Sequence, residues 1–159
     1  MSLTPAPKNS LSINRVPQEA ESPVYKRTFD FLGLLTPQTL AVKTRNTIPM
    51  AAGMASSSSF FADLVQACDR LFNWQASLDT LSCLARLGSG SACRSLYHGF
   101  VSWGAQEPGN PFCSHGVPLA VRWKELRIGL MILNHQAKPI SSRQAILLGV
   151  KTRVRILTF

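Results

Sequence analysis

The stretch that decides the fold runs from Asn46 to Trp103 and reads NTIPMAAGMASSSSFFADLVQACDRLFNWQASLDTLSCLARLGSGSACRSLYHGFVSW. It contains two segments rich in small residues, Pro49–Ser57 and Gly88–Arg94, and each adjoins a predicted helix. Glycine and alanine leave backbone N–H groups accessible, and serine hydroxyls add further hydrogen-bond donors. We therefore interpret both segments as cradles for anionic groups.

Two amphipathic helices are predicted between these segments. Apolar residues recur at helical spacing from Phe60 to Phe72, which predicts a helix that begins near Ala55–Ser57 and ends at Asn73. The next helix is predicted from a Ser77 cap to Gly88. We expect its apolar face to consist of Leu78, Leu81, Leu84, Ala85 and Leu87.

The N-terminal part gives weaker signals. Residues 1–21 contain three prolines and little periodicity, so we expect an extended and partly disordered lead-in. Ser22 and Pro23 are typical of a helix start, and Val24, Phe29, Leu32 and Leu35 would share the apolar face of that helix. Alternation with β-branched residues predicts a strand at Leu40–Asn46.

Downstream of the second cradle the pattern predicts shorter elements. They are a short helix at Ala92–Leu96, a strand at Gly99–Trp103, a loop at Gly104–Pro118, a buried strand at Arg127–Asn134 and a helix at Arg143–Val150. The last residues, 151–159, alternate basic with apolar side chains, as an edge strand does.

The composition is that of a globular protein with an excess of positive charge. Hydrophobic residues make up 45% of the 159 residues, and 17 Lys and Arg against 8 Asp and Glu give a net charge of +9. Such a balance favours anionic partners: nucleic acid, membrane phospholipid or a phosphorylated small molecule. A solvated basic face without any partner explains the same charge.

The four cysteines, Cys68, Cys83, Cys93 and Cys113, form no C-x-x-C pair, so we expect no zinc site. Reduced thiols in a cytoplasmic protein are the simple interpretation. The sequence shows neither a secretory signal in its first 20 residues nor an apolar run of about 18 residues, so we expect no membrane span.

The cradles assign candidate binding residues. Free N–H groups at the start of the first long helix favour a phosphate beside the set Gly53, Ala55, Ser56 and Ser57. In the second cradle the set is Ser89, Gly90, Ser91 and Arg94, whose guanidinium suits a carboxylate or a phosphate. Tight packing explains either segment alone, but both together indicate a ligand with more than one anionic group. No general base or thiol nucleophile is indicated by spacing.

These motifs resemble a known family. The segment P-M-A-A-G-M-A-S-S, followed by a helix, resembles the phosphate-binding loop of the GHMP superfamily. A-R-L-G-S-G-S-A-C-R-S-L, Ala85–Leu96, is more specific and resembles the signature of the diphosphomevalonate decarboxylases. Weaker likeness extends over residues 13–152, including Ser22-Pro-Val-Tyr-Lys-Arg and Ile140-Ser-Ser, and leaves 153–159 as a divergent tail.

The resemblance implies a partial GHMP-type (ribosomal protein S5-like) domain of the α+β class over 22–152, with helices on a mixed sheet. It implies ATP-dependent decarboxylation of mevalonate 5-diphosphate to isopentenyl diphosphate, with ATP and Mg²⁺ as cofactors. Ser89, Gly90 and Ser91 would then contact the diphosphate, Arg94 would hold the carboxylate, and the first cradle would hold the ATP phosphates. Association into a homodimer is a separate expectation.

Some family features have no match here. The strand motif A-P-x-N-I-A-x-x-K-Y-x-G-K has only a faint echo in Thr4–Lys8, and the half of the family that supplies a catalytic Asp is not matched. An alternative is therefore a catalytically inactive, truncated chain that binds diphosphate or nucleotide. A basic nucleic-acid-binding module is a third alternative, which rests on net charge alone.

Overall fold

The computed structural model describes residues 1–47, 56–104, 114–129, 145 and 147–149. Its main sheet contains four strands in the order β1-β4-β2-β3. β4 runs antiparallel to β1 and parallel to β2, while β3 pairs antiparallel with β2, so the sheet is mixed. The bounds are Ser2–Pro5 for β1, Ser10–Ile13 for β2, Val16–Pro17 for β3 and Leu40–Thr44 for β4.

The strands at the N-terminus correct the prediction for residues 1–21. These residues are extended, as expected, but the expected partial disorder is wrong, because they supply three strands of the sheet. Leu3 and Leu11 both stand opposite Val42 in the register, and all three side chains are buried. The predicted tail, 153–159, lies outside the described residues.

A tight turn joins β2 to β3. Ile13 pairs with Val16, so only Asn14 and Arg15 lie between the strands. Both have positive φ, 53° and 68°, as a two-residue type I′ hairpin requires. The Asn14 side-chain oxygen also accepts a hydrogen bond of 2.7 Å from the backbone N–H of Asn46, which ties the turn to the end of β4.

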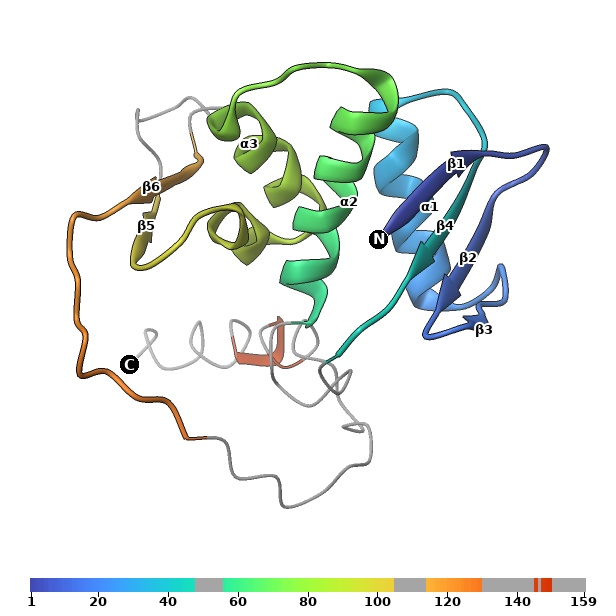
Figure 1. Ribbon diagram of the computed structural model, residues 1–159. Coiled ribbons are helices and arrows are strands. Elements are labelled where there is room, and N and C mark those ends of the chain that lie inside the picture. The colour runs from blue at the N-terminus through green and yellow to red at the C-terminus, as the bar shows by residue number, and fades with distance from the viewer. Residues whose placement is uncertain (48–55, 105–113, 130–144, 146, 150–159) are drawn as a thin grey trace, which may run out of the picture.

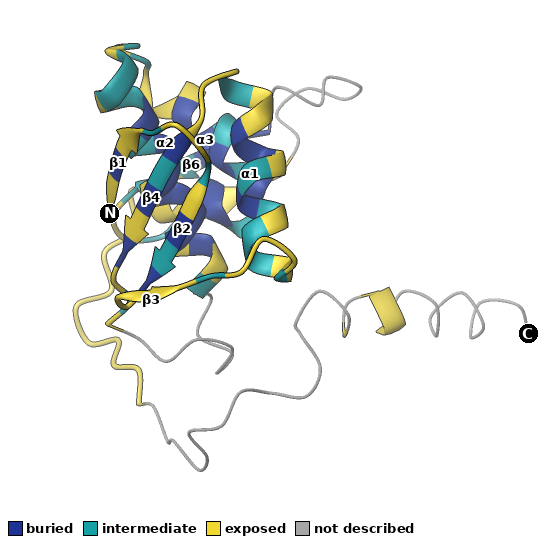
Figure 2. Cartoon of the chain, turned by 90° about the vertical axis from the view of Figure 1, so that its right-hand side faces the viewer, coloured by how far each residue is buried: buried dark blue, intermediate teal, exposed yellow. Residues whose placement is uncertain are grey.

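Three helices lie on one face of the sheet (Figure 1; Figure 2). They are α1 (Pro23–Leu35), α2 (Ser56–Phe72) and α3 (Leu78–Gly88), in agreement with the predicted helices. Ser22 and Ser77 cap α1 and α3 by accepting hydrogen bonds from the N–H groups of Tyr25 and Thr80. With the mixed sheet, these helices confirm the α+β class.

The core lies between this sheet and the helices. Leu40, Leu64 and Val65 are fully buried there, and Phe61 packs edge-to-face on Phe31 with ring centroids 5.1 Å apart.

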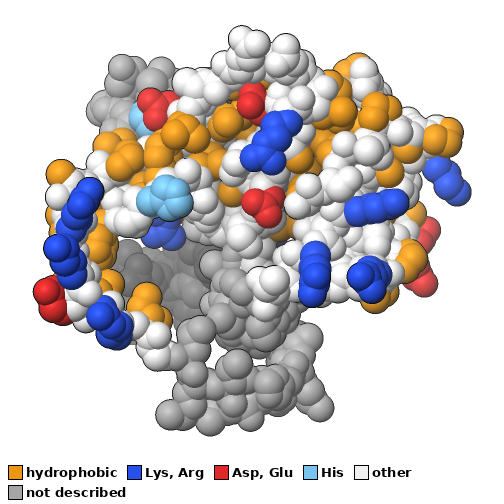
Figure 3. All heavy atoms as spheres, viewed as in Figure 1, with side chains coloured by type: hydrophobic (Ala, Val, Ile, Leu, Met, Phe, Trp, Pro, Cys, Tyr) orange, Lys and Arg blue, Asp and Glu red, His pale blue; other side chains and the backbone are white. Residues whose placement is uncertain are grey.

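Two apolar faces differ from the prediction. Phe31, which the predicted face of α1 omits, is buried. Leu78 and Leu87 of α3 were expected to be buried but are 52% and 50% exposed. Figure 3 shows apolar side chains reaching the surface of the helical layer on the face drawn.

The second half of the described chain adds smaller elements. A 3₁₀ helix, η1, spans Gly90–Leu96, and β5 (Val101–Trp103) pairs antiparallel with β6 (Gly116–Pro118). The prediction of a structureless loop through Pro118 is therefore wrong at β6. The strand expected at Arg127–Asn134 is absent in its described part, where Ile128 is 80% exposed.

Of the helix predicted at the C-terminal end, residues 145 and 147–149 are described, and they are helical. Among the described residues, no helix has both the length and the apolar character needed to cross a membrane.

Candidate functional site

The fold brings the described end of the first predicted cradle next to the second cradle. Ser57, at the start of α2, has its hydroxyl 3.4 Å from the hydroxyl of Ser89 at the end of α3. One residue further along α2, the Ser58 hydroxyl hydrogen-bonds the Ser95 hydroxyl of η1 at 2.7 Å. The start of α2 and the 3₁₀ helix therefore share a row of hydroxyl groups, although 32 and 37 positions of sequence separate the paired serines.

A buried hydroxyl on α3 holds η1 in this place. Ser82 has no exposed surface, and its hydroxyl donates to the carbonyl oxygen of Cys93 at 2.9 Å. The same hydroxyl accepts from the N–H of Gly116 in β6 at 2.8 Å. A Cβ at Gly116 would stand 2.8 Å from the Cys93 carbonyl oxygen, so only glycine permits this approach. α3, η1 and the β5–β6 hairpin are thus joined at one point.

A hollow of about 350 Å³ opens between α2, η1 and the start of β5. Arg94 is exposed at this hollow, and its guanidinium carbon lies 5.9 Å from the centre of the Trp103 ring. The side chains and backbone that line it are Ser58, Ser91, Arg94, Ser95, Gly99, Phe100 and Val101. Hydroxyl groups and one cation therefore face the same space, as an anionic ligand requires.

Of the predicted site residues of the second cradle, Ser91 and Arg94 line this hollow, and Ser89 and Gly90 directly precede Ser91 in the chain. Ser89 is buried, Ser91 is half-buried, and Gly90 and Arg94 are exposed. They belong to the end of α3 and to η1, so the segment predicted as a loop is mostly 3₁₀ helix.

The first cradle is described only in part. Ser56 and Ser57 lie in the first turn of α2, while Gly53 and Ala55 lie outside the described residues.

Sequence reasoning missed several residues at this site. Ser58 and Ser95 are paired there, and Phe100 lines the hollow. Ser58 had a signal, because it continues the run of serines at the helix start. Trp103 had none, since only the docking of the β5–β6 hairpin brings its ring to Arg94 and Gly90.

The 3₁₀ helix η1 also carries a buried thiol, that of Cys93. Burial raises the pKa of the Cys93 thiol above its ordinary value, and the nearby Arg94 guanidinium opposes this only in part. A thiol with a raised pKa is a poor nucleophile at neutral pH. Among the described residues, Cys68, Cys83 and Cys93 are free cysteines.

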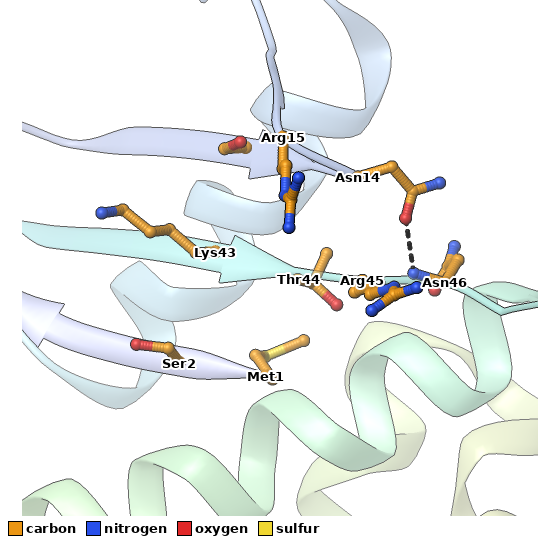
Figure 4. A pocket seen from close by; sticks show the side chains of 9 residues that line it. Met1, Ser2, Asn14, Arg15, Lys43, Thr44, Arg45 and Asn46 are labelled. Atoms are coloured by element: carbon orange, nitrogen blue, oxygen red, sulfur yellow. Dashed lines mark hydrogen bonds between the residues drawn. The ribbon is translucent and has the colours of Figure 1, made fainter.

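A second and larger hollow, of about 580 Å³, lies at the end of β4 (Figure 4). Among the described residues, Arg15, Lys43 and Arg45 line it with cationic side chains, and no acidic residue does. Figure 4 shows Arg15 extending from the β2–β3 turn toward β4. The lining ends at Asn46, three residues before the part of the first cradle that is not described, 49–55.

Among the described residues, no group of three or more His, Cys, Asp and Glu is placed to hold a metal ion.

Comparison with protein families gives a match over most of the chain. Residues 4–112 match the model described as the diphosphomevalonate decarboxylase-like N-terminal domain. The diphosphomevalonate decarboxylase of Danio rerio is 40% identical over 109 residues, which cover 67% of this chain and 26% of the relative. That of Saccharomyces cerevisiae is 36% identical over 115 residues, which cover 71% of this chain and 29% of the relative. This chain therefore spans less than a third of either relative.

Solved structures agree. Mevalonate diphosphate decarboxylase from Staphylococcus aureus superposes with a TM-score of 0.67 at 30% identity, over 74% of this chain and 37% of that one. The Enterococcus faecalis enzyme gives 0.64 at 32% identity, over 72% and 36%. A structure of MDDEF in complex with MVAPP, AMPPCP and magnesium gives a TM-score of 0.64 at 32% identity. The match covers 72% of this chain and 35% of that one. The fold, the cradle signature and these matches agree, and the chain belongs to the diphosphomevalonate decarboxylase family of GHMP-type proteins.

Proposed function

We propose that this chain binds mevalonate 5-diphosphate and ATP in one site, as the ligand-holding part of ATP-dependent decarboxylation to isopentenyl diphosphate. The observation that carries the proposal is the meeting of the two cradles. Ser57 and Ser89 come within 3.4 Å of each other, so groups held by the two segments would lie side by side. A phosphoryl transfer needs this proximity, because catalysis there rests mainly on positioning and charge stabilisation.

In this proposal the second cradle holds the substrate. Ser89, Gly90 and Ser91 contact the diphosphate through hydroxyl and backbone N–H donors, and Arg94 holds the carboxylate. The support is chemical: Arg94 presents a planar, permanently charged fork at a hollow that hydroxyl groups line. The complex of MDDEF with MVAPP, AMPPCP and magnesium supports the choice of ligands.

The first cradle holds the ATP phosphates in the proposal, through Gly53, Ala55, Ser56 and Ser57. The exposed Ser57 hydroxyl would offer an oxygen ligand to a Mg²⁺ ion bound with the nucleotide, and the ion would supply positive charge beside the phosphates. We also assign the cationic hollow at the end of β4 to the nucleotide, because it adjoins the chain segment that leads into this cradle.

Two assays separate this function from its alternatives. Calorimetric titration with mevalonate 5-diphosphate and with MgATP tests binding, and release of labelled carbon dioxide from the substrate carboxyl tests turnover. Binding of both ligands supports the proposal, with turnover at about 1–1000 s⁻¹ showing the full reaction and its absence showing a chain that binds only. Failure to bind either ligand would refute the proposal. Salt-sensitive DNA binding in their place would support the nucleic-acid alternative.

Cytoplasmic location and a homodimer belong to the proposal as well. The three free thiols support a reducing compartment. The exposed Leu78 and Leu87 on α3 support association between copies. Light scattering at several protein concentrations tests the second point: a monomer at all of them would contradict it.

A further inference from the structure

The indole ring of Trp103 lies close to two of the residues assigned to the substrate. It lies against Arg94, whose guanidinium carbon is 5.9 Å from the ring centre. It also lies against Gly90, where a Cβ would stand only 3.0 Å from the ring atom Cη2. The absence of a side chain at position 90 therefore lets the ring approach the cradle closely.

Contacts outside the hollow hold the ring in this position. The indole Nε1–H donates to the hydroxyl of the buried Ser114 at 3.1 Å. Trp103 also pairs with Gly116 across the β5–β6 hairpin. Gly116 is fixed to η1 through the Ser82 hydroxyl, which bonds the Cys93 carbonyl oxygen. The ring and the 3₁₀ helix that carries Arg94 are thus parts of one hydrogen-bonded unit.

The chemistry of the pair is suited to orienting a charge. The face of an indole is the most favourable aromatic surface for a cation, and a guanidinium stacks on it readily. An exposed arginine otherwise loses much rotamer freedom when it binds an anion. An arginine side chain already held near a ring loses less rotamer freedom on binding, so the anion binds more tightly.

We infer that Trp103 is a positioning residue, which holds the Arg94 guanidinium against the cradle for the carboxylate of the substrate. The inference rests on the proposed function for the identity of that ligand. It does not make Trp103 a catalytic residue, because its ring acts through Arg94.

Binding of mevalonate 5-diphosphate tests the inference in solution. Trp103→Leu should raise the dissociation constant about three-fold, the size expected when a partly exposed cation–π contact is lost. Trp103→Phe keeps an aromatic face and should restore most of the affinity. Trp123→Leu is the control, since Trp123 is 58% exposed and lines neither hollow. A Leu variant that melts like the wild type and binds as tightly would overturn the inference.

A second measurement needs no ligand. If the ring holds Arg94, its ring current shifts the side-chain proton NMR resonances of Arg94 upfield. Trp103→Leu should remove this shift, and Arg94→Lys identifies which resonances belong to Arg94. Equal Arg94 shifts in wild type and Leu variant would overturn the inference. If the substrate binds to no variant at all, the proposed function fails, while this spectrum still decides whether the ring positions the guanidinium.

Discussion

The helix–sheet core and the second cradle are held together by different forces. The core relies on apolar side chains without exposed surface, such as Leu40, Leu64 and Val65. The cradle relies on directional contacts of small residues, above all the two hydrogen bonds of Ser82 and the close approach of Gly116. Apolar burial is non-directional and is shared among many residues, whereas a hydrogen bond depends on one atom in one place.

This difference explains why each region has its own sequence requirements. The core needs volume and periodicity, so many apolar sequences would build it. The cradle needs a hydroxyl at 82 and no side chain at 116, because any change there moves η1 and with it Arg94. Substitutions in the two regions should therefore differ in what they damage.

The largest effect on stability is expected in the core. Leu64→Ala removes a fully buried side chain of α2 and leaves a cavity. We expect a loss of about 2–5 kcal/mol in the free energy of unfolding, measured by chemical denaturation. A loss below about 1 kcal/mol would mean that the core is not packed as described.

A smaller loss of stability is expected at Ser82, where α3, η1 and β6 are joined. Ser82→Ala deprives the Cys93 carbonyl and the Gly116 N–H of their shared partner, which should cost about 1–3 kcal/mol. Ser102→Ala is the matched control, because its hydroxyl makes an exposed contact with the Val117 carbonyl. Unlike Leu64→Ala, the Ser82 variant should also weaken substrate binding while it is still folded. Equal stability of the two serine variants would contradict the assigned role of Ser82.

Alkaline pH acts on both regions. Burial raises the pKa of Cys68, in the core, to about 12, and burial together with the Asp79 hydrogen bond raises the pKa of Tyr97, beside the cradle, to about 12. A raised pKa means that the folded state keeps a proton which the unfolded state has lost. Stability is therefore complete below the unfolded pKa values and falls as the pH rises toward 12.

Variants separate the two contributions. Cys68→Ala should reduce the loss of stability that begins at about pH 9, and Tyr97→Phe should reduce the loss that begins at about pH 10. Melting curves recorded at several pH values measure both effects. Slopes that neither substitution changes would show that these groups do not titrate with unfolding.

The smallest effect on stability is expected at Arg94. Its side chain is exposed, so Arg94→Ala should change the free energy of unfolding by no more than about 0.5 kcal/mol. Thermal melting checks this. A large loss would mean that Arg94 serves the fold and not a ligand.

The sequence was sufficient for the parts of the fold that local pattern determines. Periodic apolar residues and serine caps predicted α1, α2 and α3 almost to the residue. The strands Ser2–Pro5 and Ser10–Ile13 were missed, because they are four residues long, contain few apolar residues and depend on pairing with strands distant in the sequence, above all β4.

The residues of the candidate site also fall into those that the sequence could predict and those that it could not. The residues Ser89–Arg94 could be found because they are contiguous and form a recognisable signature. Ser82 and Trp103 could not, since their roles arise when α3 and the β5–β6 hairpin dock on η1. Contacts between distant segments leave no periodic trace in a single sequence.

Titration of mevalonate 5-diphosphate into the wild type, Arg94→Ala and Arg70→Ala tests the central claim most directly. Arg70 is also exposed and lies at the far end of α2. Its substitution removes the same charge as Arg94→Ala, so it controls for non-specific electrostatic attraction. Loss of a charge-assisted contact should weaken binding about ten- to a hundredfold for Arg94→Ala. The Arg70 variant should bind like the wild type. Equal affinity of the two arginine variants would contradict the claim that the cradle holds the substrate.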